Sequence, residues 1–109
     1  MFRVIAASLI VGAVQLLFLV TSARAETGVV ALRVSGCDYY LIETNQGYTV
    51  VEWYGGHDPS RGEPVIGSFN SYGMKTIFFG QGREEGRVWI DDYWLSEDDA
   101  LEKISDQCN

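Results

Sequence analysis

The first 25 residues most constrain what this chain can fold into, because they have the pattern of an export signal. Arg3 gives a positive start, residues 4–20 are almost wholly apolar, and Ala23-Arg24-Ala25 places small residues where a signal peptidase reads. We expect a bacterial Sec-type signal, cleavage after Ala25, and a periplasmic or secreted product without stable membrane insertion. The alternative is a retained membrane anchor, since about 17 apolar residues approach the length needed to span a bilayer.

Cleavage leaves residues 26–109 as one small domain, which is strongly acidic. All 15 acidic residues but only six of the eight basic ones follow the cut, so the mature charge is −9. Such a surface repels nucleic-acid phosphate and anionic lipid, and it attracts a basic partner or a cation. Nucleic-acid binding is therefore not expected. Solubility alone is the simpler explanation of the charge.

The two cysteines, Cys37 and Cys108, both lie in the predicted mature part. Export places them in an oxidising compartment, and with a single histidine elsewhere they make a poor metal set. A bridge across 71 positions stabilises a small domain by about 4 kcal/mol in the chain-entropy treatment. We predict a structural disulfide and no metal or cofactor.

The mature sequence reads as short strands followed by one helix. Alternating or β-branched runs separated by glycine-rich turns predict strands. These runs are 29–34, 39–44, 48–54, 64–69, 74–79 and 87–93. The first two could form one long strand bent at Gly36. Residues 55–62 and 80–86 are predicted loops.

The C-terminal helix has the clearest signals. Ser96 is a good N-cap, and acidic residues 97–99 meet the positive end of the helix dipole. Leu101, Ile104 and Cys108 share one face, which we expect to pack on the core and to bring Cys108 to its partner cysteine.

Five or six short antiparallel strands suit a small closed barrel, which leaves no exposed strand edge. The long first strand bent at Gly36 favours an OB-like barrel with one C-terminal helix, and an SH3-like barrel is the alternative.

Two motifs carry a resemblance. The run EWYGGHDP at residues 52–59 and the run DYWLS at 92–96 resemble small exported bacterial proteins of uncharacterised function. The resemblance implies a periplasmic address, and no site residues come with it.

The only histidine, His57, precedes Asp58 and lies four residues before Arg61. A His–Asp pair could transfer protons near neutral pH. No nucleophile accompanies it, so we expect no enzyme and no catalytic residue. Asp91, Asp92 and the three acids 97–99 could offer oxygen ligands to Ca²⁺, but they lack the EF-hand spacing.

Two adjacent aromatic pairs, Trp53-Tyr54 and Tyr93-Trp94, are more informative. Neighbouring residues on a strand face opposite sides, so one member of each pair should be exposed, where Trp and Tyr often anchor a protein partner. The candidate partner-binding residues are Trp53, Tyr54, His57, Asp58, Arg61, Tyr93 and Trp94.

We therefore expect a non-catalytic exported binding module that recognises another protein, preferably a basic one. Acidic exported inhibitors of cationic hydrolases such as lysozyme illustrate this class. The alternative is a small barrel that binds a ligand or a cation with loops 55–62 and 80–86 as its rim.

Overall fold

The computed structural model describes residues 25–109. The predicted signal, and with it the membrane-anchor alternative, concerns residues outside the described part. Among the described residues, no helix is both long and apolar enough to cross a membrane.

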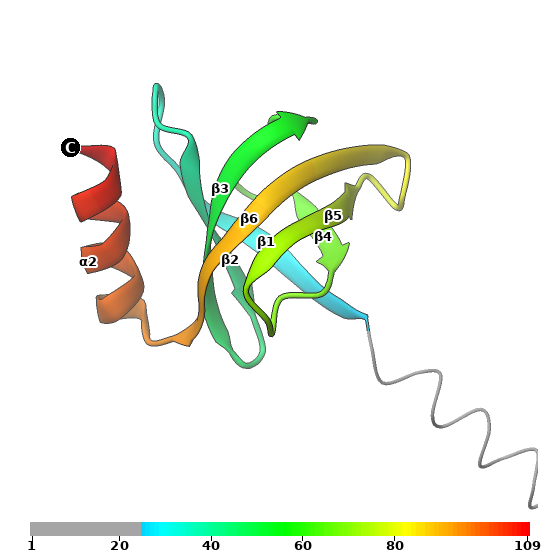
Figure 1. Cartoon of the computed structure of the whole chain (residues 1–109). Helices are drawn as coiled ribbons and strands as arrows, with labels where there is room; N and C mark the ends of the chain where they lie inside the picture. The colour runs from blue at the N-terminus through cyan, green and yellow to red at the C-terminus, as the bar shows by residue number, and fades with distance from the viewer. Residues whose placement is uncertain (1–24) are drawn as a thin grey trace, which may run out of the picture.

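Six strands and one helix make up the described chain (Figure 1). They are β1 (Glu26–Arg33), β2 (Tyr39–Thr44), β3 (Gly47–Gly56), β4 (Pro64–Gly67), β5 (Gly73–Phe79), β6 (Glu84–Leu95) and α2 (Glu97–Cys108). The last strand starts earlier than predicted, so the turn before it shortens to residues 80–83, where Gly80 has a positive φ of 57°.

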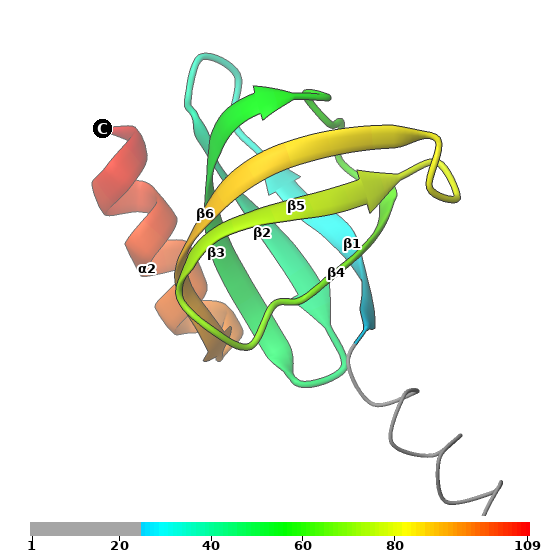
Figure 2. The ribbon, with the colours of Figure 1, turned by 45° about the vertical axis from the view of Figure 1, so that its right-hand side comes forward.

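The strands form a closed antiparallel barrel in the order β1-β2-β3-β6-β5-β4. Two three-stranded meanders, β1-β2-β3 and β4-β5-β6, are joined where β3 pairs with β6 and where β1 pairs with β4. Figure 2 shows β5 and β6 crossing the front of the barrel, with α2 at its side. The predicted class, a mainly β closed barrel with one C-terminal helix, is confirmed.

The prediction of one long first strand bent at Gly36 is wrong. The chain reverses there, and β1 and β2 pair antiparallel, with Arg33 opposite Tyr40. Gly36 has a φ of 79°, the left-handed conformation that such a reversal requires and that glycine adopts most readily. The preference for an OB-like over an SH3-like barrel rested on that long strand and loses its support.

Apolar side chains fill the barrel interior. Its completely buried members are mostly aromatic and β-branched, which suits inward-facing positions on strands. They include Tyr40, Ile42, Val51, Phe69, Ile77, Phe79, Val88 and Ile90. This interior leaves the functional surface on the outside and at the ends of the barrel.

The helix covers a second, smaller core on the outside of β2 and β3. Ala100 and Ile104 pack there against Leu41 and Val50. The expectation that Leu101 shares this core face is wrong, because its side chain is 44% exposed. The predicted disulfide between Cys37 and Cys108 is present and ties the helix end to the β1–β2 turn.

Candidate functional site

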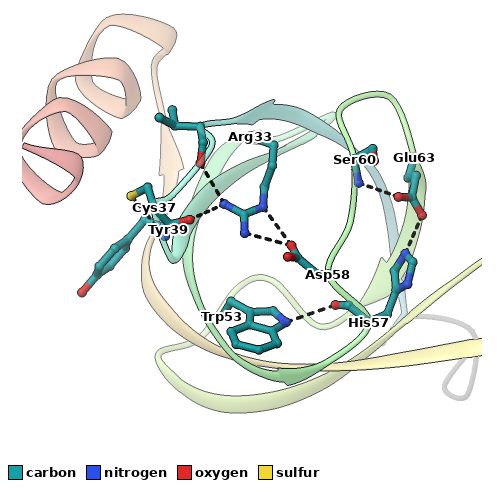
Figure 3. Close-up of polar contacts among 9 residues, drawn as sticks. Arg33, Cys37, Tyr39, Trp53, His57, Asp58, Ser60 and Glu63 are labelled. Atoms are coloured by element: carbon teal, nitrogen blue, oxygen red, sulfur yellow. Dashed lines mark hydrogen bonds and ion pairs between the residues drawn. The ribbon is translucent and has the colours of Figure 1, made fainter.

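The loop after β3, residues 57–63, lies across one end of the barrel (Figure 3). The His57 ring there lies between two carboxylates. Its Nε2 is 2.8 Å from Glu63 Oε1 and its Nδ1 is 2.8 Å from Glu84 Oε2. Since a carboxylate accepts and cannot donate, both contacts are hydrogen bonds only when the ring is the doubly protonated imidazolium.

The surroundings of His57 favour that charged form. The hydrogen bond to Glu63 raises the pKa of His57, burial opposes it, and the charge of both carboxylates adds to the rise. Burial alone would raise the pKa of Glu63, but the Ser60 amide and His57 outweigh it and lower that pKa. Because both ring nitrogens contact carboxylates, His57 links the loop after β3 to Glu84 at the start of β6.

The predicted His57–Asp58 pair does not form, because Asp58 binds Arg33 instead. The Asp58 Oδ1 atom accepts from Arg33 Nη2 at 2.8 Å and from Nε at 3.1 Å. Arg33 Nη1 donates to the backbone oxygens of Val34 and Cys37. The guanidinium is thus held by fixed acceptors, and it lies 5.5 Å from the centre of the Tyr40 ring. Arg33 and Asp58 close this end of the barrel.

A shallow depression of about 400 Å³ lies outside this closed end, and Arg61 lines it together with Arg33 and Asp58. Trp53 lies on the inner side, where its Nε1 donates to the His57 backbone oxygen at 3.3 Å. Four of the predicted site residues, Trp53, His57, Asp58 and Arg61, therefore meet at one end of the barrel.

The other end carries three contacting rings, Tyr72, Tyr93 and Trp94, which we call the aromatic cluster. The Tyr72 and Tyr93 centroids are 4.9 Å apart with planes tilted by 56°, and those of Tyr93 and Trp94 are 5.5 Å apart in an edge-to-face arrangement. Tyr93 also packs against the barrel core, whereas Tyr72 is 61% and Trp94 53% exposed. The cluster is anchored on one side and open on the other.

Trp94 has an uncommon backbone conformation, with a φ of 59°. For a bulky residue this left-handed conformation costs about 1–3 kcal/mol. Gly47 of β3 lies close to this part of the chain, and an added Cβ there would lie 2.8 Å from the Leu95 oxygen and 3.1 Å from the Trp94 carbonyl carbon. This conformation directs the Trp94 side chain outward, where it is not buried in the barrel core.

A carboxylate lies beside the cluster. Asp92 Oδ1 accepts from the Tyr93 amide at 2.9 Å and from the Tyr72 hydroxyl at 3.4 Å. Its negative charge is the main cause that raises the pKa of Tyr72. The Lys103 ammonium is 3.4 Å from Asp92 and 3.8 Å from Asp91, so two carboxylates share one ammonium.

A third feature is the outer side of β3, β6 and β5, which we call the sheet face. Trp89 of β6 lies between its strand partners Glu52 of β3 and Met74 of β5. Trp89 is 41% and Met74 38% exposed, and Tyr54 of β3 is also exposed. The helix contacts β2, β3 and β6 but leaves β5 free, so this face has no cover within the described chain.

In each predicted aromatic pair, one side chain packs on the core and the other is exposed, as expected for neighbours on a strand. Trp53 and Tyr93 pack on the core while Tyr54 and Trp94 are exposed. The β3–β6 ladder runs from Gly56 opposite Gly86 to Tyr48 opposite Leu95, which places the two pairs toward opposite ends of the barrel. The seven predicted residues therefore do not form one patch.

Sequence reasoning missed several residues that the fold brings in, among them Trp89 and Met74 of the sheet face. Arg33 and Glu84 join the closed end through contacts between distant segments, for which the sequence carries no local signal, whereas Glu63 contacts His57 from six residues further along the same loop. Tyr72 joins the aromatic cluster. Its position between the predicted strands 64–69 and 74–79 was a usable signal, since a large aromatic ring in a short surface connection is exposed.

The acidic residues considered for Ca²⁺ are spread over separate contacts. Asp91 and Asp92 face Lys103, whereas Ser96 caps the helix by accepting from the Asp99 amide at 3.2 Å. Across residues 25–109, no group of three or more His, Cys, Asp or Glu side chains could hold a metal ion.

In comparisons with protein-family models, with curated proteins and with solved structures, nothing matches this chain. Its function is therefore argued from the geometry alone.

Proposed function

We propose that this protein is a non-catalytic binding module, exported to the periplasm or secreted, that recognises a basic protein. The observation that carries the proposal is the set of large aromatic side chains left exposed next to carboxylates. Trp89 lies beside Glu52, and Trp94 lies in a cluster that contacts Asp92. Exposed Trp and Tyr are frequent anchors of protein interfaces, and the carboxylates favour a basic partner.

The charge of the domain supports the same proposal. Residues 26–109 carry nine more acidic than basic side chains. Long-range attraction of this kind speeds the encounter with a cationic protein and weakens with salt.

The filled interior supports binding at the surface over binding inside the barrel. The interior side chains Tyr40, Phe69 and Phe79 have no exposed area. The four polar side chains that close one end are engaged with one another in ion pairs. The non-catalytic assignment is supported by His57, whose two ring nitrogens are both occupied by carboxylates.

Lysozyme is a defined cationic probe for this proposal. We expect the oxidised protein to bind native lysozyme at low salt and to release it at high salt. Lysozyme whose lysines have been succinylated keeps the same chain but loses the positive charge, and it should not bind. Equal binding of the two forms, or binding to neither at low salt, would count against a basic partner of this kind.

Variants of the sheet face locate the interaction. Trp89→Ala should weaken lysozyme binding about tenfold or more, since removal of a central interface aromatic often costs more than 1 kcal/mol. Leu101→Ala is the matched control, because Leu101 is an apolar side chain of similar exposure, 44%, on α2 and outside the sheet face. If both variants bind like the parent, the sheet face is not the binding surface.

A further inference from the structure

We propose that the aromatic cluster of Tyr72, Tyr93 and Trp94, together with Asp92, is a binding site for one organic cation, the arginine or lysine side chain of a partner protein. This inference rests on the proposed function and names the chemical group that one part of the surface takes. The aromatic cluster would thus be a second contact surface beside the sheet face, and the group that it binds would be a cation.

The rings offer what a cation needs. An ammonium or guanidinium is attracted to the face of Trp or Tyr, and the attraction is largest for Trp. Three rings in tilted and edge-to-face contact hold each other in place, with centroids 4.9 and 5.5 Å apart. Tyr72 and Trp94 keep more than half of their surface open to solvent. A ligand therefore meets aromatic surface that needs little rearrangement.

The carboxylate supplies the matching charge. Asp92 contacts the Tyr72 hydroxyl and the Tyr93 amide, so it is fixed next to two of the three rings. Lys103 is the only basic side chain paired with Asp91 and Asp92 among the described residues, and it leaves one negative charge uncompensated. That remaining charge favours a second cation beside the rings.

A bulge in β6 presents the Trp94 ring, because β6 has two residues between Asp92 and Leu95 where β3 has one between Val50 and Tyr48. The Trp94 φ of 59° turns the ring away from the core, and half of the ring remains exposed. Strain of this kind persists where a side chain must be presented in a fixed position.

The site also contains its own competitor. The Lys103 ammonium lies 3.4 Å from Asp92, and its positive charge lowers the pKa of Tyr72 that Asp92 raises. An incoming cation therefore shares or displaces Lys103. Removal of this lysine should strengthen binding, which is a result that few other arrangements predict.

The test is an NMR titration of the intact, oxidised protein with N-acetyl-arginine amide. The three indole N–H signals of Trp53, Trp89 and Trp94 report separately on the closed end, the sheet face and the aromatic cluster. We expect the Trp94 signal to shift most, with a dissociation constant on the order of 10 mM or weaker because exposed cation–π contacts are individually small. N-acetyl-citrulline amide has nearly the same shape without the charge, and it should cause no comparable shift.

Variants separate binding from folding. Trp94→Gly removes the ring and suits the positive φ, so it should abolish the Tyr72 and Tyr93 shifts while the melting temperature stays equal or rises. Lys103→Met should tighten binding by about two- to fivefold, the range expected for loss of one nearby surface charge. Tyr54→Ala, which removes an exposed ring toward the other end of β3, is the matched control and should leave the titration unchanged.

Three results would overturn the inference: equal shifts with the citrulline compound, equal shifts at Trp89 and Trp94, or an undiminished response of Trp94→Gly at Tyr72 and Tyr93. Failure of the cation site can be distinguished from failure of the proposed function. If arginine amide binds at Trp94 but no lysozyme is retained, the cation site stands and the proposed function fails for that partner. If lysozyme is retained but arginine amide causes no larger shift at Trp94 than the citrulline compound does, the proposed function stands and the cation site fails.

Discussion

At the scale of single residues, the two ends of the barrel differ in how their charges are used. His57 lies between Glu63 and Glu84, and Asp58 pairs with Arg33, so the charged side chains of the closed end hold the loop after β3 in place. At the other end, Asp91 and Asp92 share one lysine beside exposed rings. The same acidic composition therefore produces one end whose carboxylates hold a loop in place and another end whose carboxylates lie beside exposed rings.

The paired His57 should make stability depend on pH. Its pKa in the folded protein lies above the value of 6.5 that it has when unperturbed. The stabilisation is therefore complete below that value and is lost as pH rises through the higher folded pKa. We expect His57→Gln to lose about 1 kcal/mol of unfolding free energy at pH 6 and less at pH 9, as measured by urea unfolding at both values.

Glu84→Gln is the control for His57, because it removes one charge while leaving the ring in place. Glu84 is more than half exposed, so Glu84→Gln should lower the unfolding free energy by less than His57→Gln does. A parent protein whose unfolding free energy stays constant from pH 6 to pH 9 would contradict this account of His57.

Gly47 should be intolerant of any side chain. Its φ is 132°, and an added Cβ would lie 2.8 Å from the Leu95 oxygen and 3.1 Å from the Trp94 carbonyl carbon. Gly47→Ala should destabilise the protein by about 2 kcal/mol or more in thermal or urea unfolding. Gly55→Ala is the matched control, since nothing lies within 4 Å of its added Cβ, and its effect should stay below about 1 kcal/mol. Equal effects of both would contradict the close approach of β3 and β6.

At the scale of elements, the helix was predictable because its signals are local. The Ser96 cap, the acidic first turn and the buried Ile104 could all be read from neighbouring residues. Leu101 has the right spacing but lies at the edge of the contact with the barrel, which depends on how α2 is placed. The reversal between β1 and β2 was missed for a related reason, since a glycine between two apolar runs fits both a bulge and a turn.

Replacement of the N-cap residue Ser96 tests how much the cap stabilises α2. The Ser96 Oγ accepts from the Asp99 amide at 3.2 Å, and alanine removes this acceptor. Ser96→Ala should lower the unfolding free energy by about 1 kcal/mol. Ser105→Ala, at an exposed position inside the same helix, should be neutral or slightly stabilising, since alanine is the better helix former. A loss at Ser105 as large as that at Ser96 would contradict the capping role.

At the scale of the whole molecule, the disulfide is the prediction with the widest consequence. Cys37 and Cys108 join the β1–β2 turn to the end of α2 across 71 positions. Each cysteine has one possible partner within the chain, so the pairing could be predicted from the number of cysteines and the expected export. Replacement of both by alanine should lower the unfolding free energy by about 4 kcal/mol in the chain-entropy treatment, measured against the oxidised parent. A loss below about 1 kcal/mol would mean that the barrel holds without the bridge.

The candidate surface was less predictable than the fold. Alternation along a strand predicted that one member of each adjacent aromatic pair is exposed, and the structure confirms this with Tyr54 and Trp94. It could not show that Tyr72 joins Trp94, or that Arg33 takes Asp58, because these contacts connect segments whose distance is set only when the barrel closes. The residue types were visible in the sequence, and their neighbours were not.

The most direct test of the central claim is capture of partners from the envelope fraction on the immobilised, oxidised protein, in parallel with a Trp89→Ala/Trp94→Gly variant. Proteins that elute with salt are identified by mass spectrometry. We expect a basic protein that the parent column retains at low salt and releases at high salt. The variant column should not retain this protein. Retention that is equal on both columns, or that persists at high salt, would contradict a charge-assisted aromatic interface.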